Sequence, residues 1–195
     1  MFINNLINKF GYSEMYEWSE LFKYNIVPFG RFVTFADNEI GKIKLANEND
    51  FIIGVTTINS AYTSDDPEEW QGKYLSNEYG DILIKKSSEN ENAANNIYGI
   101  NVTPLINESY DKQLAYKKRS DRTEWVRVNL IGKCIIEDNG ECKPCQWCTV
   151  GKNGIAIPYI DFSQNSQNSQ NSQNSQCKYY VIDRISDNTI MIFFK

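Results

Sequence analysis

The sequence predicts a mainly β protein, with a compact β-sandwich or barrel-like body, one or two short helices and an N-terminal amphipathic segment. The first observation is a series of short apolar runs separated by turn residues, which is typical of all-β folds. These runs are 31–35, 42–45, 51–55 and 82–85. The second is size, since 195 residues of which 41% are hydrophobic can bury one good core. We therefore expect one domain.

The first ten residues form a segment of their own in this prediction. Their apolar side chains fall at helical spacing and predict a short amphipathic helix that ends near Gly11. These side chains are Phe2, Ile3, Leu6, Ile7 and Phe10. The predicted organisation is therefore an amphipathic segment at 1–10 followed by a single β domain at 11–195.

A short helix is predicted to begin at Asp65. An aspartate here is a suitable N-cap, Pro67 would take the first helical position, and Glu68 and Glu69 would lie favourably near the positive end of the helix dipole. These roles would explain the acidic cluster without any catalytic function.

Two strands are predicted close to the C-terminus. The apolar runs 178–182 and 189–193 flank Ser186-Asp187-Asn188, which is a typical turn sequence. Residues 163–176, just before this hairpin, repeat Ser, Gln and Asn without any apolar residue to bury. We expect that tract to be a flexible loop, with a self-associating polar zipper as the alternative.

Composition excludes several classes of function. The chain has no histidine, which rules out Ser-His and Cys-His catalysis and every zinc site that needs histidine. Its net charge of -5 and pI near 4.9 leave no basic surface for phosphate groups, so we expect no nucleic-acid partner. We find neither a signal peptide nor a run long enough to span a bilayer, and we expect no membrane partner and no cofactor.

Three short signatures occur in order along most of the chain. They are Tyr-Ser-Glu-Met-Tyr-Glu-Trp at 12–18, Glu-Glu-Trp-Gln-Gly-Lys-Tyr-Leu at 68–75 and Arg-Ile-Ser-Asp-Asn-Thr at 184–189. Together they resemble the peptidase G2 family, the autoproteolytic intramolecular chaperone domain of phage neck-appendage and tail-spike proteins. The resemblance covers roughly residues 11 to 195.

This resemblance implies a catalytic residue and a cleavage site. The family's catalytic glutamate matches Glu14, and the cleaved bond would lie near Phe10-Gly11, although the family commonly has an acidic residue where this chain has Gly11. Glu17 and Glu69 are weaker candidates for a second carboxylate. The alternative is that Glu14 and Glu17 are exposed or turn-capping acids without catalytic function.

Cys142, Cys145 and Cys148 have a spacing that could suit zinc, with Cys134 or Cys177 as a fourth thiolate. The resemblance instead implies that Cys142 and Cys148 occupy family positions and that Cys145 is additional. A disulfide between Cys142 and Cys148, or free thiols, is therefore our expectation, and zinc is the weaker alternative.

The resemblance also implies a role and partners. We expect a free-standing chaperone-like domain that forms a homotrimer, acts as a viral or phage structural or assembly protein, and is found in the virion or the host cytoplasm. The first alternative is an active self-cleaving glutamic peptidase that uses Glu14. The second is a binding module that docks a fibre or capsid protein. Residues 1–10 would then be either a helix packed on the domain or the remnant of an oligomerisation stem.

Overall fold

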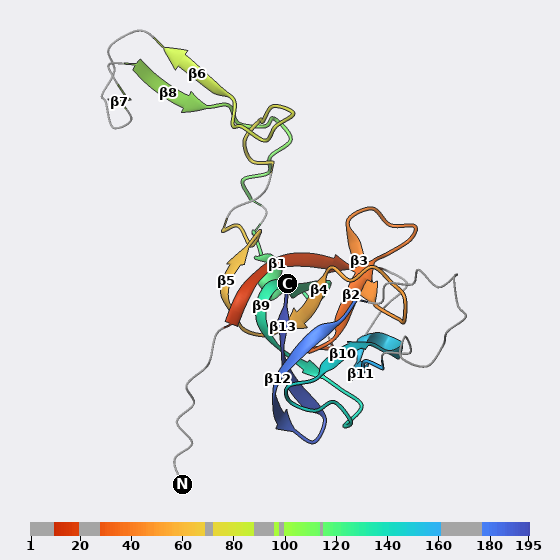
Figure 1. Cartoon of the computed structure of the whole chain (residues 1–195). Coiled ribbons are helices and arrows are strands. Elements are labelled where there is room, and N and C mark those ends of the chain that lie inside the picture. Colours follow the sequence, from red (N-terminus) through yellow and green to blue (C-terminus); the bar gives the residue numbers. More distant parts are fainter. Residues whose placement is uncertain are drawn as a thin grey trace, which may run out of the picture. The chain divides into compact units, whose positions relative to one another are not determined.

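The computed structural model describes residues 10–19, 28–68, 72–87, 96–97, 100–113, 115–160 and 177–195 (Figure 1). The chain divides into two compact units: Met1–Asp66 with Arg119–Lys195, and Pro67–Lys118. In the described residues the regular structure is β-strand, apart from two 3-10 turns at Arg119–Asp121 and Lys152–Gly154. The mainly β class predicted from the sequence is therefore confirmed.

The first unit is a ten-stranded mixed sheet whose spatial order is β11-β10-β12-β13-β9-β4-β2-β3-β1-β5. Its strands are β1 (Phe10–Trp18), β2 (Phe32–Phe35), β3 (Lys42–Leu45), β4 (Gly54–Thr57), β5 (Ser60–Ser64), β9 (Trp125–Glu137), β10 (Trp147–Val150), β11 (Ala156–Pro158), β12 (Tyr179–Ser186) and β13 (Thr189–Phe194). Strand β9 also pairs with β1, so β9, β4, β2, β3 and β1 form a closed ring of paired strands.

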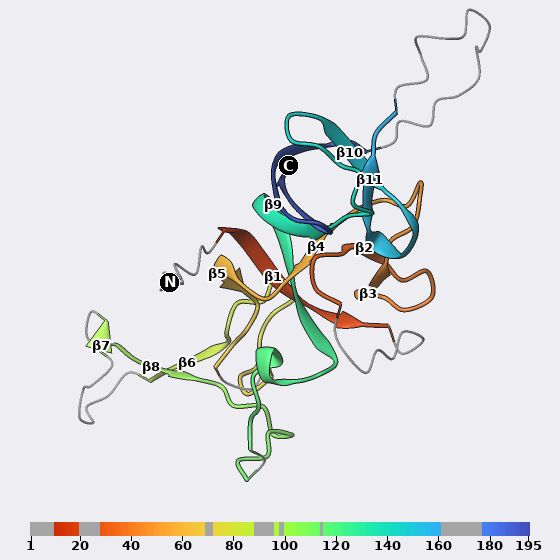
Figure 2. The same ribbon diagram turned by 90° about the horizontal axis from the view of Figure 1, so that it is seen from below.

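Strand β9 connects two hydrophobic cores and runs through much of this unit (Figure 2). Its first half contributes Val126 and Val128 to a core shared with β1, β2 and β3. Its second half contributes Cys134 and Ile136 to a core shared with β10, β12 and β13. These residues alternate along the strand, as expected when one face of a strand is buried.

Several predicted strands are confirmed. The run 42–45 is β3, and the C-terminal runs form the antiparallel pair β12 and β13, with Asp187 and Asn188 in the turn between them. The runs 51–55 and 82–85 are displaced by two or three residues, to β4 and to β6 (Ile84–Ser87).

The helix predicted to begin at Asp65 is wrong for residues 65–68, which contain no helix. Asp65 has a left-handed φ of 57° and its carboxylate pairs with Arg119. The Asp66 carboxylate accepts a hydrogen bond from the backbone N–H of Ser120 at 3.1 Å. Both acids therefore bind another part of the chain instead of capping a helix.

The second unit contains a small antiparallel sheet in the order β6-β8-β7. Strand β7 is Asn96–Ile97 and β8 is Ile100–Pro104. Isolated bridges join Tyr74 to Ile106 and Ser76 to Ile82. None of the residues whose burial is described in this unit is buried.

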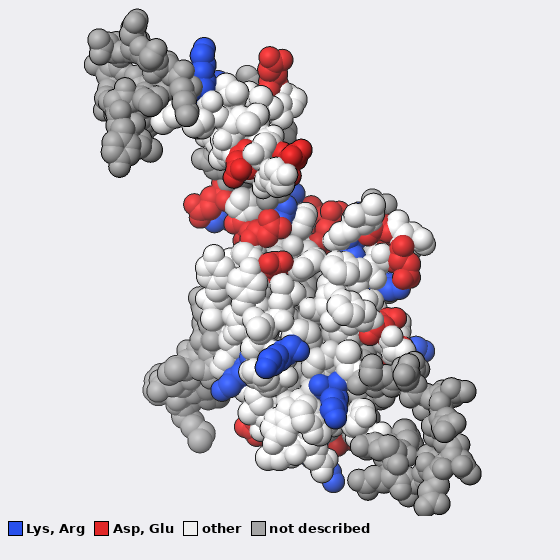
Figure 3. Space-filling model, turned by 45° about the horizontal axis from the view of Figure 1, so that its top comes forward, with Lys and Arg blue, Asp and Glu red and all other residues white. Residues whose placement is uncertain are grey.

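Two predicted features lie outside the described residues: the amphipathic segment, apart from Phe10, and the Ser-Gln-Asn tract. Across the described ranges, no helix has the length and apolar character to span a membrane. On the face drawn in Figure 3, the basic side chains are scattered, and several of them lie beside acidic ones.

Candidate functional site

The signature at 12–18 forms most of β1, so its residues alternate between two faces of a strand. Ser13 and Met15 are buried on one face. Tyr12, Glu14 and Tyr16 occupy the other face and are each partly exposed. The spacing of the signature is therefore the period of a β-strand, which places its two tyrosines on either side of the glutamate.

Both carboxylate oxygens of Glu14 accept hydrogen bonds from these tyrosines. The Tyr12 hydroxyl donates to Oε1 at 2.9 Å, and the Tyr16 hydroxyl donates to Oε2 at 3.2 Å. Tyr12 also stacks on Tyr62 of β5, with ring centroids 5.6 Å apart, and its hydroxyl lies 2.7 Å from the Ser64 Oγ. Glu14 is thus held in one orientation by the side chains around it.

The electrostatics of this face favour the neutral form of Tyr16. Partial burial, followed by the negative charge of Glu14 and its hydrogen bond, raises the pKa of Tyr16 to about 12. Asp65 adds a smaller effect in the same direction on this pKa. Tyr16 therefore remains a hydrogen-bond donor to Glu14 throughout the physiological pH range.

The opposite face of β1 carries a buried network of hydroxyl groups. The Ser13 Oγ lies 2.7 Å from the Ser60 Oγ and 3.0 Å from the Thr63 Oγ1. Ser60 and Thr63 are themselves 2.7 Å apart. Because these residues belong to β5, the network fastens β1 to its parallel neighbour beneath the Glu14 face.

The bond predicted to be cleaved, Phe10-Gly11, lies at the start of β1. Gly11 has a φ of 70°, which strains any residue with a side chain. A Cβ at this position would lie 2.3 Å from the Asn129 Oδ1 and 2.6 Å from the Ile131 carbonyl oxygen. This chain therefore has no room for the acidic residue that the family commonly carries here.

In this conformation Glu14 is not beside the predicted bond. A strand advances about 3.3 Å per residue, so the α-carbons of Gly11 and Glu14 are about 10 Å apart along β1. Tyr12 lies between them on the same face as Glu14 and holds its carboxylate. The catalytic role of Glu14 at this bond therefore stays a prediction.

The weaker carboxylate candidates have other roles or are not described. Glu17 forms an ion pair with Lys42 at 3.2 Å, and Lys42 also approaches Glu39 at 3.4 Å. Glu69 lies outside the described residues. No second carboxylate from this set is therefore seen beside Glu14.

The cysteines are divided between the interior and the surface. Cys142 and Cys148 are buried, whereas Cys145 is exposed and has a left-handed φ of 62°. A hydrogen bond with Cys142, followed by burial, raises the pKa of the Cys148 thiol. The weak zinc set of Cys142, Cys145 and Cys148 is thus not assembled, and no group of three potential ligands occurs in the described part of the chain. All five cysteines are free thiols, so the Cys142–Cys148 disulfide is not formed.

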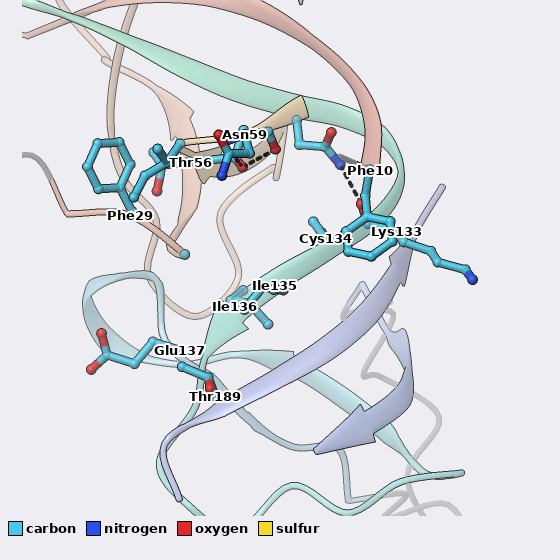
Figure 4. Close-up of a pocket in the computed structure, with 14 residues that line it drawn as sticks. Phe10, Phe29, Thr56, Asn59, Lys133, Cys134, Ile135, Ile136, Glu137 and Thr189 are labelled. Atoms are coloured by element: carbon cyan, nitrogen blue, oxygen red, sulfur yellow. Dashed lines mark hydrogen bonds between the residues drawn. The ribbon is translucent and has the colours of Figure 1, made fainter. Parts of the chain in front are cut away.

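A cavity of about 320 Å³, which the sequence did not indicate, adjoins the predicted cleavage site (Figure 4). We call it the junction cavity because Phe10 is one of its walls. Its other walls include residues 29–30, residues 56–59 and part of β9. Its side chains are far apart in sequence, and no local motif connects them.

The comparisons with known proteins agree with the signatures. Residues 6–177 match the family described as "Peptidase_G2, IMC autoproteolytic cleavage domain". The chain is 30% identical over 126 residues to the pre-neck appendage protein of Bacillus phage B103, which covers 64% of this chain and 14% of that protein. It is 32% identical over 129 residues to the putative phage-related protein YobO of Bacillus subtilis, which covers 65% of this chain and 15% of that protein. The chain therefore spans only a small part of the length of these relatives.

Two solved structures share the fold. The C-terminal fragment of bacteriophage phi29 gene product 12 superposes with a TM-score of 0.67 at 21% identity, covering 94% of this chain and 99% of the fragment. The pre-mature phi29 gene product 12 superposes with a TM-score of 0.71, covering 96% of this chain and 22% of that one, also at 21% identity. The fold is thus that of the C-terminal fragment of phi29 gene product 12.

Proposed function

Because this chain belongs to the peptidase G2 family of intramolecular-chaperone cleavage domains, we propose that it is an assembly domain of a phage appendage that does not cut itself as an isolated chain. The observation that carries this proposal is the geometry of β1. Glu14 is bound by two tyrosines on a continuous strand, about 10 Å from Gly11 along the chain. A carboxylate must lie within hydrogen-bond reach, directly or through one water molecule, of the group it activates.

Homotrimerisation, a fibre or capsid partner and a place in the virion are parts of the same proposal. They are supported by the similarity to phage appendage proteins. Sedimentation velocity at micromolar concentration tests the assembly, and we expect one species with three times the 22.6 kDa mass of the chain. A stable monomer would contradict the proposed trimer.

Intact-mass spectrometry of the purified chain tests the absence of self-cleavage. We expect the uncut mass for wild type, and the same result for Glu14→Gln and for the control Glu17→Gln. Glu14→Gln removes acid-base function but keeps the size of the side chain, and Glu17 is already paired with Lys42. An N-terminus at Gly11 in wild type and Glu17→Gln, but not in Glu14→Gln, would make this protein a peptidase.

The second candidate function is that peptidase, with Glu14 acting on the junction of another subunit. The specific observation in its favour is that two tyrosine hydroxyls fix the Glu14 carboxylate in one orientation, as a preorganised catalytic group requires. Cleavage between subunits would slow on dilution below the dissociation concentration of the trimer. A rate independent of dilution would exclude this version.

A further inference from the structure

The chain contains two Asn-Gly pairs, Asn139-Gly140 and Asn153-Gly154. In this dipeptide the backbone attacks the preceding side chain most easily, because glycine has no Cβ to hinder its nitrogen. The attack on the asparagine amide closes a five-membered imide, which water then opens to aspartate or isoaspartate. Both pairs have the same residues, so any difference in their reactivity comes from the fold.

The first pair lies in the exposed loop between β9 and β10. The Asn139 N–H donates to the Ala156 carbonyl oxygen at 3.1 Å, which fixes the amino side of this residue. Within the described ranges, no hydrogen bond holds the peptide group between Asn139 and Gly140. That peptide group can therefore rotate, and the Gly140 nitrogen is free to act as a nucleophile.

The side chain of Asn139 is held by the residue that follows the glycine. The Glu141 N–H donates to the Asn139 Oδ1 at 3.1 Å, and the Glu141 Oε2 accepts a hydrogen bond from the Asn139 Nδ2 at 2.7 Å. The first contact places a donor at the oxygen on which negative charge develops when the Gly140 nitrogen attacks. The second places a carboxylate at the nitrogen that must leave as ammonia, and a carboxylate at this distance can transfer a proton.

The second pair is held in place on both sides. Asn153 has a left-handed φ of 57°. Its N–H donates to the Asn47 Oδ1 at 3.1 Å, and its carbonyl oxygen accepts a hydrogen bond from the Arg31 Nη1 at 3.2 Å. Gly154 is buried, and a Cβ there would lie 2.4 Å from the Phe32 carbonyl oxygen. Closing the imide requires the Asn153 backbone to rotate, and these contacts oppose that rotation.

We propose that Asn139 is a site of spontaneous deamidation in the folded protein and that Glu141 assists the reaction. The Gly140 nitrogen forms a bond to the Asn139 Cγ, the Cγ–Nδ2 bond breaks, and the proton of Gly140 leaves with Nδ2 as ammonia. Water then adds to one imide carbonyl. Opening the bond to Cγ gives aspartate, and opening the main-chain bond gives isoaspartate. Water is the only co-reactant, and no electrons are transferred.

The product would change the surroundings of Arg184 in the third signature. Arg184 binds the Asp138 carboxylate at 2.7 Å and the Cys142 carbonyl oxygen, so its partners lie on either side of Asn139 in the sequence. Isoaspartate adds one carbon to the backbone between these partners, and both products add a negative charge there. We therefore expect deamidation to loosen the contact between this loop and β12.

Mass spectrometry of the full chain, incubated at neutral pH and sampled over weeks, tests the proposal. Deamidation replaces a side-chain amino group by a hydroxyl, and peptide mapping assigns the mass change to Asn139 or Asn153. We expect Asn139 to react at least about tenfold faster than Asn153 in the folded chain. In urea, which removes the contacts of both pairs, the two rates should become similar, and the rate at Asn139 should not exceed its folded value.

Two matched variants test the role of Glu141. Glu141→Gln keeps the size of the side chain but removes the carboxylate, and it should slow deamidation at Asn139 at least about fivefold. Glu78→Gln, at an exposed glutamate of the second unit, should react as wild type does. Equal rates at the two pairs in the folded chain, or faster reaction of Asn139 in urea, would overturn the proposal. If Glu141→Gln reacts as fast as wild type or faster, Glu141 only holds the amide and the assisted reaction is wrong.

The melting temperature tests the consequence for the loop. Aged wild type should melt at a lower temperature than fresh wild type, whereas Asn139→Gln, which closes the larger ring far more slowly, should keep its value on ageing. An unchanged melting temperature in chain that is deamidated at residue 139 would overturn the loosening of the loop. Cleavage near Gly11 would leave both mapped peptides intact, so the result does not depend on the proposed function.

Discussion

Both compact units contain isoleucines, but the isoleucines compared here are buried in the first unit and half-exposed in the second. Ile43, Ile190 and Ile192 in the first unit are completely buried, whereas Ile84 and Ile106 in the second are 47% and 48% exposed. The difference is topological. The first unit closes a ring of paired strands and extends it through β13, β12 and β10, while the described residues of the second form three short strands in one layer. Apolar composition allows a core, but only layers that cover each other create one.

The strongest test of this comparison is amide hydrogen exchange. Amides paired between β9 and β13 should exchange only through global unfolding, and those paired between β6 and β8 should exchange through local opening. We expect protection factors that differ by a factor on the order of 10³ or more. Similar protection in the two sheets would mean that the second unit is buried in an assembly.

A matched pair of substitutions measures the same contrast as stability. Ile192→Ala, at a fully buried position, should lower the free energy of unfolding by about 2 to 5 kcal/mol because it leaves a cavity. Ile84→Ala, at a half-exposed position, should cost less than about 0.5 kcal/mol. Urea denaturation measures both values. Equal losses would show that the second unit has a core of its own or is covered by a partner.

The sequence predicted the parts of this contrast that local patterns determine. The run 42–45 and the C-terminal hairpin were found because apolar alternation and turn residues mark them. The thirteen-residue strand β9 was missed, although Val126, Val128 and Leu130 alternate within it. The run 51–55 is displaced to β4 because β2 and β9 pair with residues 54–57. The partner strands decide which residues of an apolar run pair, and the sequence of the run alone does not.

The sequence predicts which residues belong to the candidate site, but not how they are arranged. Glu14 was identified from a family signature, and nothing local indicated that Tyr12 and Tyr16 would bind it or that Gly11 would lie against Asn129. The junction cavity depends on segments far apart in sequence, and a single sequence does not reveal such contacts. Whether Glu14 is catalytic stays a prediction.

A buried ion pair extends the comparison from apolar groups to charges. The Asp138 side chain is fully buried and accepts hydrogen bonds from the Arg184 Nη2 at 2.7 Å and from the Cys142 backbone N–H at 3.1 Å. Asp138→Asn should cost about 1 to 3 kcal/mol, because it leaves a partly buried cation without its charged partner. The control Asp37→Asn, which removes the exposed acid of a pair with Lys44, should cost less than about 0.5 kcal/mol. Equal costs in urea denaturation would show that burial does not strengthen the Asp138 pair.

The smallest expected effect is at Tyr16, on the partly exposed face of β1. Its pKa is about 12 in the folded protein, against 10.0 for the ordinary tyrosine of an unfolded chain. Below pH 10 both states keep the proton and stability is unaffected. Between pH 10 and 12 the unfolded chain loses the proton first, so the folded state loses stability as the pH rises.

Comparison of Tyr16→Phe with wild type isolates this contribution from the other groups that titrate at high pH. Between pH 9.5 and 11.5, wild type should lose about 1 kcal/mol more stability than Tyr16→Phe, a value reduced because Tyr16 is only partly buried. Glu14→Gln should lower the extra loss, because the Glu14 charge and hydrogen bond are the second and third causes of the raised pKa, after burial. The control Tyr79→Phe, at an exposed tyrosine of the second unit, should retain the wild-type dependence. If Tyr16→Phe and wild type lose stability equally, the hydrogen bond between Tyr16 and Glu14 does not hold the carboxylate, and Tyr12 is its remaining tyrosine donor.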